Sequence, residues 1–144
     1  MKILIFGHDD KKQLFLQNDE YELTYMDIRV DDVEAVITLI ETTRPDRVVN
    51  INVDCFHDDL DLELNIRNNL YGPLTIANAC ASHGIHFSHV NGNSEHASQS
   101  IVQGFTNKLL KQMCESAQIL LVNTSCNQED IASLIINGEC GLVL

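Results

Sequence analysis

Three evenly spaced histidines, His83, His86 and His89, are the first residues in the chain that suggest chemistry, because imidazole is a common metal ligand. The segment 85–90 is predicted to be a β-strand, and successive strand residues point to opposite faces of a sheet. His86 and His89 are an odd number of residues apart, so their side chains are expected on opposite faces. The sequence therefore predicts no shared metal site at these histidines.

An acidic run with the sequence HDDLDLE, at 57–63, is the second candidate for ion binding. It lacks the ligand order and the turn glycine of a calcium loop. We interpret it as the charged first turn of a helix, where acidic side chains interact favourably with the helix dipole. An acidic face at 54–63 that mimics a polyanion and occupies a basic partner protein stays open as an alternative.

Nucleophilic side chains are present without the partners that would activate them. The sequence has no G-x-S-x-G elbow of a serine hydrolase. It also has no C-x-x-C pair, which argues against a zinc cage or a disulfide framework. We interpret the cysteines as reduced thiols; they lie at positions 55, 80, 114, 126 and 140.

Short apolar runs alternate with longer amphipathic segments along the whole chain. Strands are predicted at 2–6, 21–26, 47–51, 85–90 and 119–122, with a short sixth at 141–144. Helices are predicted from a capping box at Asp31 and Glu34 to residue 43, and at about 60–82, 100–116 and 128–136. Pro73 should cost the second of these helices one backbone hydrogen bond or kink it, and Gly84 should end it. This alternation predicts one α/β domain over 1–144, a doubly wound parallel sheet of five to six strands with helices on both faces.

Composition limits the classes of partner. The formal net charge is −12, which disfavours binding to nucleic acid and to anionic membranes. No stretch approaches the apolar length of a membrane span. We expect a soluble, cytoplasmic protein.

Six phrases follow one another in the order of a known family: KILIFG at 2–7, MDI at 26–28, RPDRVVN at 44–50, NLYGPL at 69–74, HFSHV at 86–90 and LVNTS at 121–125. In this order they resemble the extended short-chain dehydrogenase/reductase superfamily, in its dTDP-4-dehydrorhamnose reductase and sugar-nucleotide-binding branch. The resemblance implies a Rossmann-like NAD(P)-binding domain and, as an ancestral activity, reduction of a nucleotide sugar. On this resemblance, we expect the chain to lack most of the family's C-terminal substrate lobe.

The phosphate-binding loop departs from the family's pattern. The family has G-x-x-G-x-x-G, whereas Gly7 is followed here by Asp10 and Gln13 at the other two glycine positions. Asp9 and Asp10 also add negative charge where a pyrophosphate would lie, although the lysines at 11 and 12 offset it. We expect this loop not to bind a dinucleotide in the family's manner.

The family's acid–base pair, Y-x-x-x-K on a helix, is also missing. No tyrosine is followed by a lysine four residues later. The segment 104–108 occupies the corresponding place, so Lys108 is either the family's lysine without its tyrosine or an ordinary surface lysine. The family's assisting serine or threonine is missing after Val90, and Ser94 is a displaced candidate.

These departures imply a non-catalytic binding or regulatory module with no catalytic residues and no bound cofactor. Vestigial cofactor contacts are expected at Gly7, Asp27, Ile28 and Lys108 if NAD(P) binding is retained. Asp27 could equally cap a helix. The alternative is an NAD(P)-dependent nucleotide-sugar reductase that another chain completes. The resemblance also implies a homodimer through the helices near 60–82 and 100–116, and a protein partner is possible.

Overall fold

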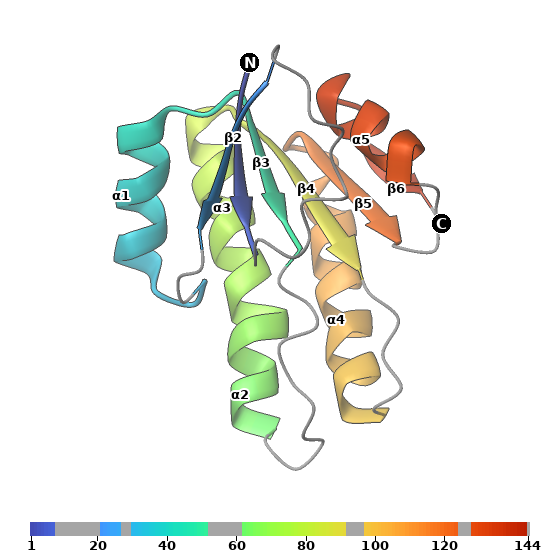
Figure 1. Ribbon diagram of the computed structural model, residues 1–144. Helices are drawn as coiled ribbons and strands as arrows, with labels where there is room; N and C mark the ends of the chain where they lie inside the picture. The colour runs from blue at the N-terminus through green and yellow to red at the C-terminus, as the bar shows by residue number, and fades with distance from the viewer. Residues whose placement is uncertain (8–20, 27–29, 52–61, 92–96, 124–127, 144) are drawn as a thin grey trace.

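The described residues form one parallel β-sheet with helices packed against it. The computed structural model describes residues 1–7, 21–26, 30–51, 62–91, 97–123 and 128–143 (Figure 1). The sheet has six strands in the order β2-β1-β3-β4-β5-β6, and every neighbouring pair is parallel. The Rossmann-like sheet of five to six strands is confirmed, with six. The strands are β1 (Lys2–Phe6), β2 (Glu22–Met26), β3 (Arg47–Asn50), β4 (His86–Asn91), β5 (Ile119–Asn123) and β6 (Gly141–Val143).

Helices cover both faces of the sheet, as predicted. On one face, α1 (Val33–Thr43), α3 (Gly72–His83) and α4 (Ala97–Met113) bury alternate strand residues such as Leu4 and Phe87. On the other face, α5 (Gln128–Ile136) buries the intervening residues, such as Ile5 and Leu120. Strands β1 and β5 are nearly continuous apolar runs because both of their faces are buried.

Helix α1 begins one residue later than the capping box predicts. Asp32, rather than Asp31, is the N-cap, and its carboxylate accepts a hydrogen bond of 3.1 Å from the Ala35 amide. The predicted cap at Asp31 is wrong because Val30 and Asp31 belong to the turn before the helix. The helix ends at Thr43, and Arg44 takes the left-handed conformation with φ 47°.

The single helix predicted at about 60–82 is three joined segments. They are α2 (Leu62–Ile66), a π-helical turn η2 (Arg67–Tyr71) and α3, which ends at Gly84 as expected. Pro73 has no amide hydrogen to give to the carbonyl of Asn69, four residues earlier. The hydroxyl of Thr106 on α4 donates to that carbonyl instead. The predicted kink is therefore a π-turn, whose freed carbonyl binds a neighbouring helix.

Gly72, at the junction of η2 and α3, allows a very close approach of the chain. A Cβ atom on Gly72 would lie 2.2 Å from Cγ2 of Val30 and 3.1 Å from its Cβ. Val30 is itself fully buried in the turn before α1. The glycine therefore lets α1 and α3 pack side by side.

Arg47 of β3 fastens α5 to the sheet. Its Nε donates to the carbonyl of Ile135 at 3.0 Å, and one terminal nitrogen donates to Ile136 at 3.2 Å. The last carbonyls of a helix have no partner within the helix, so the guanidinium satisfies the C-terminal end of α5. Over the ranges that the structure describes, no helix has the length and apolar character needed to cross a bilayer.

Candidate functional site

The carboxyl edge of the sheet is where an open parallel sheet binds ligands, at the point where the strand order reverses. β1 lies between β2 and β3, so this point is at the ends of β1 and β3. Gly7 ends β1, and its amide donates to the Met26 carbonyl at 3.2 Å. A Cβ atom on Gly7 would lie 2.6 Å from Cγ1 of Ile51, so the packing of Ile51 alone requires this glycine. Gly7 by itself is therefore no sign of a phosphate.

Buried polar side chains gather at the ends of β3 and β4. Nδ1 of His89 lies 3.2 Å from Nδ2 of Asn50, and both residues are buried. Because the amide nitrogen is a donor, His89 accepts through Nδ1 and is neutral in this contact. Burial lowers the pKa of His89 to about 4, and the smaller effect of the Asn91 side chain acts in the opposite direction.

Helix α4 continues this polar region beyond the strand ends. Nδ2 of Asn91 donates to Oδ1 of Asn107 at 2.9 Å, which links β4 to α4. Gln103, one turn earlier on α4, is 8% exposed, and its amide nitrogen has no hydrogen-bond partner among the described residues. The lower ends of α2 and α4 extend past the strand tips in Figure 1. The site can thus donate and accept hydrogen bonds, but these amides take up and release no proton near neutral pH.

We expect the buried neutral His89 to make stability depend on pH. In the unfolded chain its pKa is the ordinary 6.5, whereas in the folded chain it is about 4, so the unfolded state binds more protons between these values. The contribution is fully present above pH 6.5 and falls by about 3 kcal/mol as the pH drops to 4. Urea unfolding of the wild type and of His89→Gln across this range measures the difference in slope.

His86→Gln is the matched control for that measurement. Burial lowers the pKa of His86 as well, so its own removal changes part of the slope but leaves the contribution of His89. Equal pH slopes for His89→Gln and the wild type would contradict the buried neutral histidine.

Solved structures share this architecture. L780 of Acanthamoeba polyphaga mimivirus, described as a UDP-rhamnose synthase, superposes with a TM-score of 0.79 at 20% identity, covering 99% of this chain and 73% of that one. A dTDP-4-dehydrorhamnose reductase from Clostridium acetobutylicum superposes with a TM-score of 0.76 at 15% identity, covering 99% and 72%. The chain has the Rossmann-type fold of these enzymes. The resemblance inferred from the six sequence phrases is thereby confirmed at the level of fold.

Some solved structures with this fold contain a cofactor. A dTDP-4-dehydrorhamnose reductase from Bacillus anthracis, solved in complex with NADP, has a TM-score of 0.64 at 16% identity and covers 85% of this chain and 52% of its own. By sequence, L780 is 26% identical over 147 aligned positions, which cover 76% of this chain. The chain spans about half the length of that curated relative, 51%. No family model matches the sequence.

Helix α4 is where Y-x-x-x-K lies in the family that the sequence resembles. Gln103 and Thr106 are buried and Asn107 is half-buried toward β4, whereas Gly104 and Lys108 are exposed. Gln103 and Asn107 are therefore a pair four residues apart on the side of α4 toward the sheet, next to the buried Val102, Thr106 and Leu110. The sequence analysis missed Gln103 and Asn107 because it aligned Gly104 and Lys108 with the motif. The four-residue spacing of Val102, Thr106 and Leu110, which are buried, could have shown which side of α4 faces inward.

The residues predicted to contact a cofactor are not brought together among the described residues. Gly7 lies at the carboxyl edge, while Lys108 lies on the outer side of α4 with its Nζ 5.9 Å from the Phe105 ring centre. Asp27 and Ile28 lie outside the described residues, and so does Ser94. Their roles at a cofactor stay predictions.

The structure describes all three histidines, but only the last two residues of the acidic run. Nε2 of His86 contacts the Glu139 carbonyl at 2.7 Å, whereas His89 faces the opposite side of the sheet, as predicted. His83 lies at the end of α3, 3.3 Å from a Glu41 carboxylate. Most of the acidic run lies outside the described residues, and Leu62 and Glu63 begin α2.

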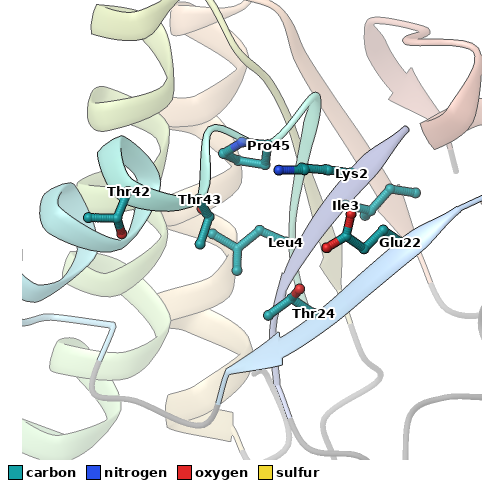
Figure 2. Close-up of a pocket in the computed structure, with 8 residues that line it drawn as sticks. All are labelled: Lys2, Ile3, Leu4, Glu22, Thr24, Thr42, Thr43 and Pro45. Atoms are coloured by element: carbon teal, nitrogen blue, oxygen red, sulfur yellow. The ribbon is translucent and has the colours of Figure 1, made fainter.

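A small pocket of about 160 Å³ lies at the opposite, amino edge of the sheet, between β1, β2 and the end of α1 (Figure 2). Thr42 and Thr43 line it, and their hydroxyls donate to carbonyls of their own helix, at Thr38 and Leu39. Lys2 and Glu22 lie at its rim, where Figure 2 shows both side chains. This pocket is distant from the polar ends of β3 and β4, and we assign it no part in the candidate site.

Proposed function

We propose that the chain is a non-catalytic binding or regulatory module built on the Rossmann-type fold of sugar-nucleotide reductases. The described residues at the ends of β3 and β4 and on α4 offer uncharged hydrogen-bonding side chains. A module of this kind binds a polar group or a protein partner without transferring a hydride.

The observation that carries the proposal is the pair of amides facing β4 from α4. Reduction of a carbonyl requires a group that gives up a proton at the reacting oxygen. Gln103 and Asn107 are two inward-facing amide side chains of α4 four residues apart, and neither side chain has an acidic proton. The neutral His89 is buried, and its Nδ1 accepts a hydrogen bond from Asn50. The described residues of this edge therefore do not fit the proton chemistry of an NAD(P)-dependent reductase.

The second candidate function is an NAD(P)-dependent oxidoreductase acting on a nucleotide sugar, as part of a larger assembly. Its support is the shared fold with enzymes whose structures contain NAD or NADP. In that case another chain or segment supplies the proton donor, and Gly7, Asp27, Ile28 and Lys108 contact the cofactor.

Cofactor titration separates the two functions. We expect no binding heat from NADH or NADPH up to millimolar concentration, because the described edge has no acid–base pair and the chain is strongly acidic. We also expect no NADPH oxidation in the presence of a nucleotide-linked 4-keto sugar. The NADP-bound reductase from Bacillus anthracis is the positive control.

A matched variant makes the titration decisive. Lys108→Ala should leave the isotherms unchanged if the chain is a module. Micromolar binding that Lys108→Ala weakens by tenfold or more, together with NADPH oxidation in the presence of the sugar, would establish the oxidoreductase instead.

We also propose self-association through the outer side of the helical layer. Ile101, Phe105 and Leu109 recur every four residues along α4 and are 62%, 58% and 42% exposed. Tyr71 of η2, which packs against α4, is 58% exposed. Large exposed apolar side chains arranged contiguously mark an interaction surface.

A groove of about 430 Å³ extends this apolar surface toward α1. Val33 and Ile37 line it from α1, Leu74 from α3 and Met113 from the end of α4. The groove and the exposed residues of α4 lie over the two helices through which the resemblance implies a dimer. A second copy that presents the same surface would cover them symmetrically.

A further inference from the structure

Two free thiols lie close to the sheet edge formed by β6. Cys114 follows α4 and is partly buried, whereas Cys140 immediately precedes β6 and is exposed. They are 26 positions apart in the sequence, with β5 and α5 between them. Their proximity is therefore a product of the fold.

Both thiols can be located relative to Ile119, the first residue of β5. The Gln118 carbonyl accepts from the Phe87 amide of β4 at 2.9 Å. Successive carbonyls of a strand point to opposite sides, so the Ile119 carbonyl points toward β6. Sγ of Cys114 lies 3.6 Å from that carbonyl oxygen. The thiol of Cys114 is thus on the β6 side of β5.

The register of β6 brings Cys140 to the same place. Gly141 pairs with Leu120, so the preceding residue, Cys140, lies beside Ile119. Cys114 packs against the buried cluster that contains Ile119, and Sγ of Cys140 lies 3.6 Å from the Gly138 carbonyl oxygen just before β6. The two thiols also interact electrostatically: burial raises the pKa of Cys114, and nearby Cys140 raises it further.

We propose that Cys114 and Cys140 are a redox-sensitive pair that a peroxide-class oxidant converts into a reversible disulfide, fastening β6 to the end of α4. The exposed Cys140 thiol reduces hydrogen peroxide, which yields one water and a sulfenic acid on Cys140. The sulfur of Cys114 then attacks that sulfur and forms the S–S bond. The departing hydroxide takes the proton of Cys114 and leaves as a second water.

Cys80 is the internal reference for reactivity. It is buried, and burial raises its pKa to about 12, so its thiolate is scarce. It should stay reduced under conditions that oxidise the proposed pair.

The test uses the full chain with Cys55→Ser and Cys126→Ser, so that Cys80, Cys114 and Cys140 remain. After mild peroxide treatment and quenching, intact mass should fall by about 2 Da, the mass of two hydrogens lost in one disulfide. Cleavage after glutamate at 115, 129 and 139 separates the two cysteines into different peptides, which a disulfide joins. The joined pair should disappear with dithiothreitol, with Cys114→Ser and with Cys140→Ser, but persist with Cys80→Ser.

A thermal measurement shows that the bond forms in the folded protein. The oxidised chain should melt about 5 °C or more above the reduced chain, because the bond restricts the unfolded state. Accumulation of sulfinic acid on Cys140 without a joined peptide would overturn the proposal. So would a joined peptide that forms only in denaturant.

Discussion

Gly72→Ala should lower the free energy of unfolding by about 3 kcal/mol, the upper end of what overpacking costs in a well-packed core. The added methyl group would lie 2.2 Å from Cγ2 of Val30, far inside van der Waals contact. Val30 is fully buried, so it has no free space into which to move. Urea unfolding followed by circular dichroism measures the change.

A double-mutant cycle with Val30→Ala identifies the cause. Val30→Ala removes Cγ2, so Gly72→Ala should cost about 1 kcal/mol or less in that background. Gly104→Ala is the matched control, because nothing lies within 4 Å of a Cβ atom there. In the helix interior it should stabilise by about 0.5–1 kcal/mol. Equal costs of Gly72→Ala with and without Val30→Ala would exclude the contact as the cause.

Phe105→Glu should abolish the proposed self-association. Phe105 is 58% exposed in the middle of the apolar residues of α4, and a charge there would be buried without a partner in a dimer. At micromolar concentration we expect the wild type to sediment at twice 16.2 kDa, about 32 kDa, and the variant at 16.2 kDa. The dissociation constant should rise by about 100-fold or more.

Ser133→Glu adds the same charge at an exposed position of α5, on the other face of the sheet, and it should sediment like the wild type. Circular dichroism and thermal unfolding of Phe105→Glu establish that the monomer is folded. A wild type that sediments only at 16.2 kDa at these concentrations contradicts the interface.

The cofactor titration and the sedimentation experiment address different parts of the proposed function. A chain that dimerises and ignores NAD(P)H is a module that uses the helical layer for association and the amide-lined edge for binding. A monomer that ignores the cofactor still fits the non-catalytic module but needs another explanation for the exposed residues of α4. Neither outcome bears on the disulfide, because the two cysteines lie at the β6 edge.

The sequence by itself determined the sheet and its order of elements. Strands such as β1 and β5 are nearly continuous apolar runs because helices cover both of their faces, and such runs are recognisable without neighbours. Gly84 marks the end of α3 because a left-handed cap favours glycine, and its φ is 66°. The departures from the family's glycine and tyrosine–lysine motifs are likewise readable from residue identity alone.

Only the tertiary structure decided which side chains of α4 face the carboxyl edge. A helix carries pairs four residues apart on every side, and packing against β5 and η2 turns Gln103 and Asn107 inward and Lys108 outward. The π-turn before α3 and the closeness of Cys114 to Cys140 could also not be predicted from the sequence. Both depend on partners distant along the chain: the Thr106 hydroxyl that takes the carbonyl freed by Pro73, and the register that sets β6 beside β5.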